Sequence, residues 1–170
     1  MYIESSPTHN IHHCTVISVG IGSGLAPHMS FLRERVHAAT TLGVDVAPYS
    51  LYFGNRFRER EFLYRDELEH IATEHGDWFT LHTAFSRDGD RRKKKVYVQD
   101  LVAVTDDARR LLLERQGMLY VCGNRNLPGP LKESINVCFA RGSIDATSLE
   151  DATKAVEDLF LHGRVQQEVW

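Results

Sequence analysis

Five short apolar segments, rich in β-branched and aromatic residues, recur along the chain and indicate the strands of a buried sheet. They cover residues 14–19, 49–53, 78–85, 118–122 and 165–169. Between them, apolar residues recur every three or four positions, which is typical of amphipathic helices. The expected helices are a stretch opened by Pro27, residues 65–75, residues 96–116, a stretch opened by Pro128 and Pro130, and a last one that ends near Gly163. Strands that alternate with helices predict a three-layer, doubly wound α/β fold with a five-stranded, mostly parallel sheet.

Length and composition fit one globular domain in the cytoplasm. The chain has 170 residues, 42% of them hydrophobic and 25% charged, and its net charge of −3 argues against non-specific binding to nucleic acid or membranes. No apolar run is long enough to span a bilayer, and three cysteines make no disulfide framework. We expect a polar lead-in over residues 1–13 and the domain over residues 14–170. If the full-length protein carries an anchor, the domain would lie on the cytosolic face of a membrane.

The first strand runs into a glycine-rich turn, Gly20-Ile21-Gly22-Ser23-Gly24, before Pro27 opens the next helix. In doubly wound sheets, the ligand lies beyond the carboxyl ends of the strands, where the strand order reverses. Backbone N–H groups at such a helix start favour a phosphate group. The spacing differs from G-x-G-x-x-G, so a turn that serves geometry alone is the alternative.

The segment after the second strand favours a ligand with a 2′-phosphate. Dehydrogenases that prefer NAD usually offer an acid to the ribose 2′-hydroxyl at this place. Residues 46–58 contain no Asp or Glu, but they include Asn55, Arg56 and Arg58.

A strongly basic loop follows the third strand. Six of the nine residues from 87 to 95 are Arg or Lys. A solvated loop and a nucleic-acid patch are two interpretations, although the run has few aromatic residues and the domain is slightly acidic. Lys95 and Tyr97 suggest a third, because a cation can pair with a phosphate while a nearby aromatic ring stacks on an adenine.

Six blocks in fixed order carry a family resemblance. They are the turn over residues 20–27, residues 51–56 (LYFGNR), 84–87 (AFSR), 95–99 (KVYVQ), 120–123 (YVCG) and 169–170 (VW). This set resembles the NADPH-binding, ferredoxin–NADP reductase-like C-terminal domain of diflavin reductases. That family includes NADPH–haemoprotein reductases and the reductases of cytosolic iron–sulfur assembly. The resemblance covers residues 14–170 and implies a Rossmann-like sheet.

The resemblance also implies roles for individual residues. The pyrophosphate would lie at Gly22, Ser23, Gly24 and Pro27. The adenosine end would use Ser86, Arg87 and Lys95 for the 2′-phosphate, Tyr97 for the adenine, and Arg56 and Gln99 in support. The hydride-transfer end would use Cys122 near the nicotinamide C4, with Gly123, Asn124 and Glu168 beside it. Trp170 would cover the flavin until the nicotinamide displaces it.

Several positions depart from the family pattern. The loop before Lys95 is longer than usual, so Lys94 is a second candidate for the 2′-phosphate. Asn124 stands where the family has Asp, which removes a negative charge near the nicotinamide. Glu168 replaces a more frequent Asp, and the turn has Ile21 and Ser23 in place of Pro and Thr.

The sequence therefore predicts the NADP(H)-binding domain of a flavin-dependent oxidoreductase. The full enzyme would pass hydride from NADPH to FAD, and then electrons through FMN to a haem or iron–sulfur protein. FAD and FMN would be bound mainly by domains of the same polypeptide that this chain does not contain. The alternative is a stand-alone NADP(H)-binding or sensing module without redox activity.

For some residues a structural role is the alternative. Cys122 would then be a small residue at a strand end, and Trp170 a cap on the core. His12, His13 and Cys14 are metal ligands by type, but adjacent ligands without a matching pair elsewhere do not predict a metal site.

Overall fold

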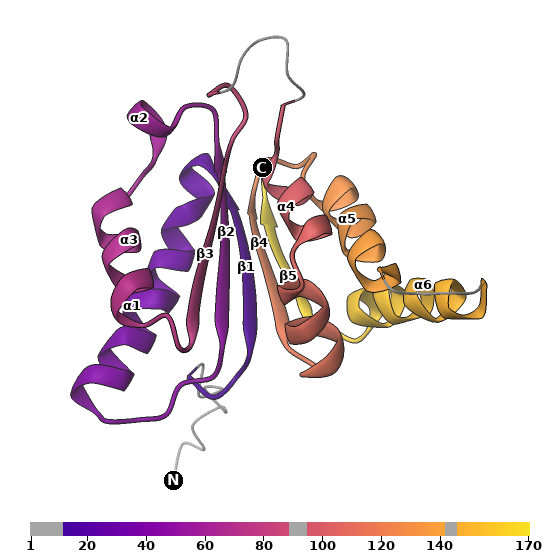
Figure 1. Ribbon diagram of the computed structural model, residues 1–170, viewed down its shortest axis with the longest axis horizontal. Helices are drawn as coiled ribbons and strands as arrows, with labels where there is room; N and C mark the ends of the chain where they lie inside the picture. Colours follow the sequence, from indigo (N-terminus) through magenta and orange to yellow (C-terminus); the bar gives the residue numbers. More distant parts are fainter. Residues whose placement is uncertain (1–11, 89–94, 142–145) are drawn as a thin grey trace, which may run out of the picture.

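The computed structural model describes residues 12–88, 95–141 and 146–170. Its centre is a five-stranded sheet in the order β3-β2-β1-β4-β5, and every strand is parallel to its neighbours (Figure 1). The strands are β1 (Val16–Ile21), β2 (Tyr49–Asn55), β3 (Phe79–Phe85), β4 (Met118–Gly123) and β5 (Val165–Val169). The doubly wound α/β fold expected from the sequence is confirmed, and the sheet is wholly parallel.

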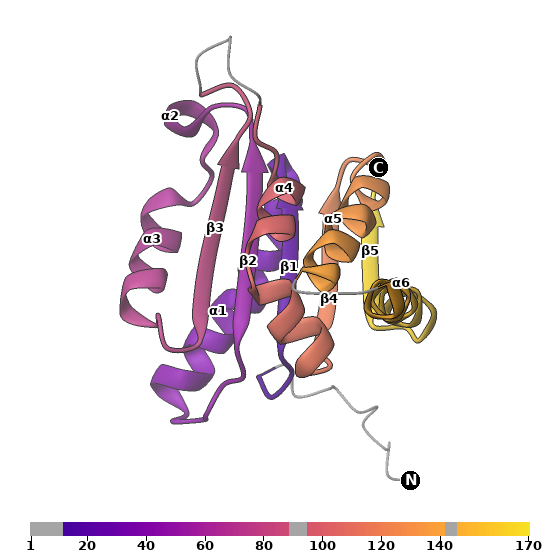
Figure 2. The ribbon, with the colours of Figure 1, turned by 45° about the vertical axis from the view of Figure 1, so that its right-hand side comes forward.

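Helices cover both faces of the sheet (Figures 1 and 2). One face carries α1 (Ala26–Thr41) and α3 (Arg65–Glu74). The other face carries α4 (Val98–Val104), η2 (Ala108–Glu114), α5 (Pro128–Ala140) and α6 (Ala146–Leu161). Two short turns of helix, η1 (Gly22–Leu25) and α2 (Arg58–Glu61), follow β1 and β2. Within the described ranges, no helix is both long and apolar enough to cross a bilayer.

The strands divide their side chains between two apolar cores. Ile17 and Val19 of β1 belong to the core under α4, η2, α5 and α6, whereas Val16 belongs to the core under α1 and α3. This alternation follows from the two-residue period of a strand. Because both faces are covered, β1 is apolar on both sides, which explains the continuous apolar run in the sequence.

Residues 96–116 are mostly helical, as the sequence predicts, but they form two helices with a break between them. α4 ends at Val104, the backbone of Thr105 is extended, and the π-helix η2 begins only at Ala108. The Thr105 hydroxyl donates to the carbonyl of Leu101 at 2.9 Å, four residues earlier. Such a side-chain bond offers the backbone an alternative to the helix.

A polar cluster holds this break against the sheet. The hydroxyl oxygens of Tyr52 and Thr105 lie 2.6 Å apart. Asp107 accepts hydrogen bonds from Ser50 of β2 and from His82 of β3, each at 2.8 Å. The His82 hydrogen bond, above all, lowers the pKa of the Asp107 carboxyl. The break is therefore anchored by strands that are distant in the sequence.

The glycine turn and a short helix also differ from the sequence prediction. β1 extends to Ile21 and so includes Gly20, which moves the start of the glycine turn to Gly22. The sequence analysis also missed α2, which has only four residues, all of them charged. Such a segment shows no apolar periodicity.

One charged side chain lies inside the core on the α1 side. Arg35 is fully buried, and its guanidinium donates to the backbone carbonyls of Cys14 and Ala47, the latter at 2.8 Å. It also lies over the ring of Tyr49, 5.1 Å from the centroid. Because the two carbonyls belong to the segments that enter β1 and β2, Arg35 ties α1 to both strands.

We expect Arg35→Met to lower the free energy of unfolding by about 2–3 kcal/mol, because buried carbonyls lose a charged donor. Urea titration measures this loss. Arg33→Met on the same helix is the control, since Arg33 pairs with Glu67 at the surface and exposed pairs contribute little. Equal losses in the two variants would contradict the role of Arg35.

Candidate functional site

The carboxyl ends of β1, β2, β3 and β4 lie at the same edge of the sheet (Figures 1 and 2). β1 pairs with β2 on one side and with β4 on the other, so the strand order reverses at β1. In doubly wound folds, this reversal opens a crevice that binds ligands. The glycine turn, the loops after β2 and β3 and the end of β4 all belong to this edge.

The glycine turn packs directly on the end of β4. Gly22 has a φ of +56°, a conformation that favours glycine. A Cβ atom added at Gly24 would lie 2.2 Å from the carbonyl oxygen of Cys122, so only glycine permits this approach. Ser23 is exposed between the two glycines, and Pro27 lies in the first turn of α1.

A cavity of about 430 Å³ lies between the loops after β2 and β3 and the start of α4. Among its lining residues are four that the sequence assigned to the adenosine end: Arg56, Ser86, Tyr97 and Gln99. The two loops are joined through their backbones. The N–H of Ser86 donates to the carbonyl of Asn55 at 2.9 Å, and the N–H of Arg87 donates to the carbonyl of Arg56 at 2.8 Å.

Exposed cations flank this cavity. Arg87 follows the lining residue Ser86, and its guanidinium lies 6.0 Å from the ring centroid of Phe57. Lys95 precedes the lining residue Val96 and is exposed. Lys94 lies outside the described residues, so the preference for Lys95 over Lys94 stays a prediction.

The residues assigned to the nicotinamide lie at the ends of β4 and β5. Cys122 is paired in register with Glu168. Burial, and then the Glu168 carboxylate, raises the pKa of the buried Cys122 thiol. The thiol therefore stays protonated at neutral pH, which suits an orienting group better than a nucleophile.

Trp170 is held beside this end of the sheet by its backbone. Its N–H donates to the carbonyl of Gly123 at 3.1 Å, and its carbonyl accepts from the N–H of Arg125 at 3.0 Å. The residue is 56% exposed, so the alternative that Trp170 caps the core is wrong. Asn124 is exposed at the same turn.

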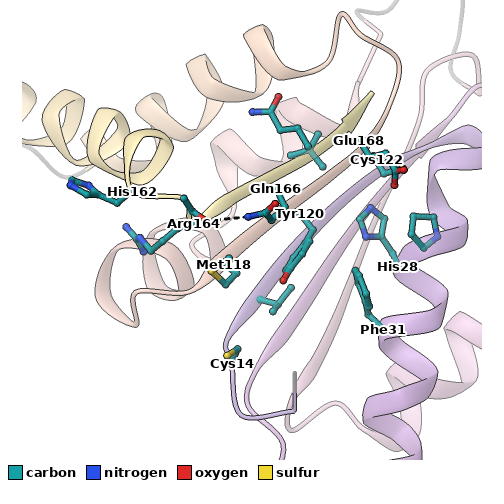
Figure 3. Close-up of a pocket in the computed structure, with 15 residues that line it drawn as sticks. Cys14, His28, Phe31, Met118, Tyr120, Cys122, His162, Arg164, Gln166 and Glu168 are labelled. Atoms are coloured by element: carbon teal, nitrogen blue, oxygen red, sulfur yellow. Dashed lines mark hydrogen bonds between the residues drawn. The ribbon is translucent and has the colours of Figure 1, made fainter. Parts of the chain in front are cut away.

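A groove of about 840 Å³ runs along β4 on the face of the sheet that carries α1 (Figure 3). Its walls are Phe31 of α1, Tyr120 and Cys122 of β4, and Gln166 and Glu168 of β5. Pro27 also lines it. The groove therefore connects the start of α1 to the end of β4.

The sequence analysis missed His28, which lines the same groove. His28 is buried, and its Nε2–H donates to the carbonyl of Val19 at 3.2 Å. Burial lowers the pKa of His28 to about 4, so its imidazole is neutral at neutral pH. No motif marks this residue, because its partner is a backbone carbonyl. Across the part of the chain that the structure describes, this groove included, no group of three or more His, Cys, Asp or Glu side chains could hold a metal ion.

Comparison with known proteins agrees with this geometry. Residues 19–129 match the model of the oxidoreductase NAD-binding domain family. The chain belongs to this family. It is 39% identical over 161 residues to the mitochondrial pyruvate dehydrogenase [NADP(+)] of Euglena gracilis, an alignment that covers 94% of this chain and 8% of that protein. It is 35% identical over 159 residues to the NADPH–cytochrome P450 reductase of Aspergillus fumigatus, which covers 91% of this chain and 22% of that protein.

These relatives confirm the resemblance to the NADPH-binding domain of the reductases. The chain is a domain of an oxidoreductase family, and it spans less than a quarter of each of these two relatives, 8% of one and 22% of the other.

Gly24→Ala tests the contact between the glycine turn and β4. We expect the free energy of unfolding to fall by about 1–3 kcal/mol, because a backbone carbonyl cannot yield to the new methyl group as a side chain would. Urea titration measures the change. Gly129→Ala in α5 is the control, since nothing lies within 4 Å of a Cβ atom there. An unchanged free energy of unfolding in Gly24→Ala would contradict the close approach of the glycine turn to the Cys122 carbonyl.

Proposed function

We propose that this domain binds NADP(H) across the carboxyl ends of β1 to β4 and serves a flavin-dependent reductase. The observation that carries the proposal is the cavity that gathers Arg56, Ser86 and Tyr97 from three separate segments. A guanidinium and a hydroxyl suit a phosphate, and an exposed tyrosine ring suits the face of an adenine. The described residues that line the cavity include no Asp or Glu. The cavity lining therefore lacks the acidic side chain that binds the ribose 2′-hydroxyl in NAD-specific enzymes.

The glycine turn would bind the pyrophosphate. The N–H groups at the start of η1 and α1 carry partial positive charge, which favours an anion. Gly24 keeps the turn close to β4, and the exposed hydroxyl of Ser23 is available as a further donor. The pyrophosphate would then lie between the adenosine cavity, which is the cavity lined by Arg56, Ser86, Tyr97 and Gln99, and the end of β4.

The end of β4 would hold the nicotinamide. Cys122, Gly123, Asn124 and Glu168 would orient the ring, with Cys122 as a protonated thiol near C4. A bound flavin supplies the hydride acceptor and the conversion to single-electron steps, which is chemistry of the cofactor. The contribution of this chain is to hold the reacting carbon in a defined place, and such positioning alone accounts for a large part of many rate enhancements.

Trp170 is the residue of this chain that fits a flavin ring. It is more than half exposed, and it lies beside Gly123 at the end of the sheet where the nicotinamide would bind. FAD and FMN would be held mainly by parts of the polypeptide outside this chain. The small share of the relatives that the chain covers, 8% and 22%, supports such a larger protein. Its electron acceptor would be a haem or iron–sulfur protein.

Coenzyme choice tests the adenosine cavity. We expect at least about a hundredfold preference for NADP⁺ over NAD⁺, because two or three charge-assisted hydrogen bonds to the 2′-phosphate together contribute about 3–6 kcal/mol. Arg87→Ala should remove most of this preference and leave the affinity for NAD⁺ nearly unchanged. Titration calorimetry with both nucleotides measures it.

Arg109→Ala is the matched control, since Arg109 is an exposed arginine of η2 that pairs with Glu114. It should leave both affinities unchanged. Equal affinities of the wild-type chain for NADP⁺ and NAD⁺ would overturn the proposed coenzyme.

Trp170→Ala tests the flavin contact in the full-length enzyme. An offset aromatic stack contributes about 0.5–1.5 kcal/mol, so removing the indole should raise the ratio of kcat/KM for NADH to that for NADPH roughly two- to tenfold. Steady-state kinetics with both coenzymes measure this ratio. The melting temperature should change little, because the side chain is largely exposed. An unchanged ratio would argue against flavin contact.

A further inference from the structure

The turn that follows β2 is closed by the carboxylate of Glu61, in α2. This carboxylate accepts hydrogen bonds from the backbone N–H groups of Arg56 at 3.1 Å and Phe57 at 3.3 Å. It also accepts from Nε of Arg56 at 3.2 Å and from Nη2 of the same side chain at 2.5 Å. The guanidinium, above all, lowers the pKa of Glu61, so the carboxylate is charged at neutral pH.

Glu61 fixes the orientation of an otherwise exposed side chain. The side chain of Arg56 is 58% exposed, and a free arginine has many rotamers. The contacts with Glu61 use Nε and Nη2, so the Nη1 side of the planar guanidinium remains for a ligand. Because Arg56 lines the adenosine cavity, its orientation determines how it meets a phosphate there.

The same turn also supports the loop after β3. The carbonyls of Asn55 and Arg56 accept the N–H groups of Ser86 and Arg87. The side-chain amide of Asn55 donates in turn to the backbone carbonyl of Glu61 at 2.9 Å. The turn that Glu61 closes is therefore hydrogen-bonded to the loop that carries Ser86 and Arg87, two residues proposed to bind the 2′-phosphate.

We propose that Glu61 is a positioning residue for 2′-phosphate recognition, acting through Arg56. This inference rests on the proposed binding of NADP(H). Glu61 does not touch the nucleotide, and it fixes the arginine before the ligand arrives. Pre-organisation of this kind improves affinity by reducing the entropy lost on binding. The repulsion between Glu61 and a phosphate is the smaller effect, since the guanidinium lies between them and neutralises the carboxylate.

The experiment titrates the 170-residue chain with 2′,5′-ADP and with 5′-AMP, which differ in the 2′-phosphate. Glu61→Gln should weaken 2′,5′-ADP about two- to tenfold, the factor associated with ordering one long side chain, and leave 5′-AMP unchanged. Glu59→Gln is the control, because Glu59 is in the same helix, loses the same charge and is 80% exposed. It should change neither affinity.

A double-mutant cycle shows whether Glu61 acts through Arg56. In an Arg56→Gln background, Glu61→Gln should have no further effect on 2′,5′-ADP. Equal losses in both backgrounds, a gain of affinity, or equal losses for the two nucleotides with a lowered melting temperature would overturn the inference. If the wild-type chain binds both nucleotides equally, the proposed function fails, and this inference fails with it.

Discussion

Everything at the candidate site depends on the parallel pairing of β1 with strands on both of its sides. Gly20 is opposite Phe53 of β2 and also opposite Cys122 of β4. This register places the ends of the three strands at one level, so the loops that follow them start from the same edge. Because the chain order reverses at β1, the crevice between these loops stays open. A shift in register would separate the adenosine cavity from the end of β4.

Glycines shape this crevice by allowing backbones to approach each other. A Cβ atom at Gly24 would meet the Cys122 carbonyl, and one at Gly54 would lie 3.0 Å from the Cβ of Val98. The first contact brings the glycine turn onto β4, and the second brings the start of α4 onto β2. The N-terminal end of α4, which carries Tyr97 and Gln99, is thereby placed over the carboxyl end of β2. The position of the adenosine cavity therefore follows from backbone packing.

The strands and most helices could be predicted because burial on two faces leaves a strong apolar pattern. The predicted strand over residues 78–85, for example, differs from β3 by a single residue at its start. The helix break at Thr105 could not be predicted, since the hydrogen bonds that hold it against the sheet come from β2 and β3, which lie more than 20 residues away. The sequence did not indicate Glu61 for a related reason. α2 has no apolar face, and the proposed role of the Glu61 carboxylate depends on a turn that exists only in the folded chain.

The same difference limits what a basic run in a sequence says about phosphate binding. Six cations over residues 87–95 indicate a positive surface, but a positive surface attracts any anion. Selectivity for one phosphate requires donors in fixed positions. Here the backbone hydrogen bonds from Ser86 and Arg87 to the turn after β2 fix two residues of the loop, and Glu61 fixes Arg56 opposite them. The specificity of such a site would therefore come from the two hydrogen-bonded loops. A net charge of −3 for the whole domain does not prevent phosphate binding at such a local site.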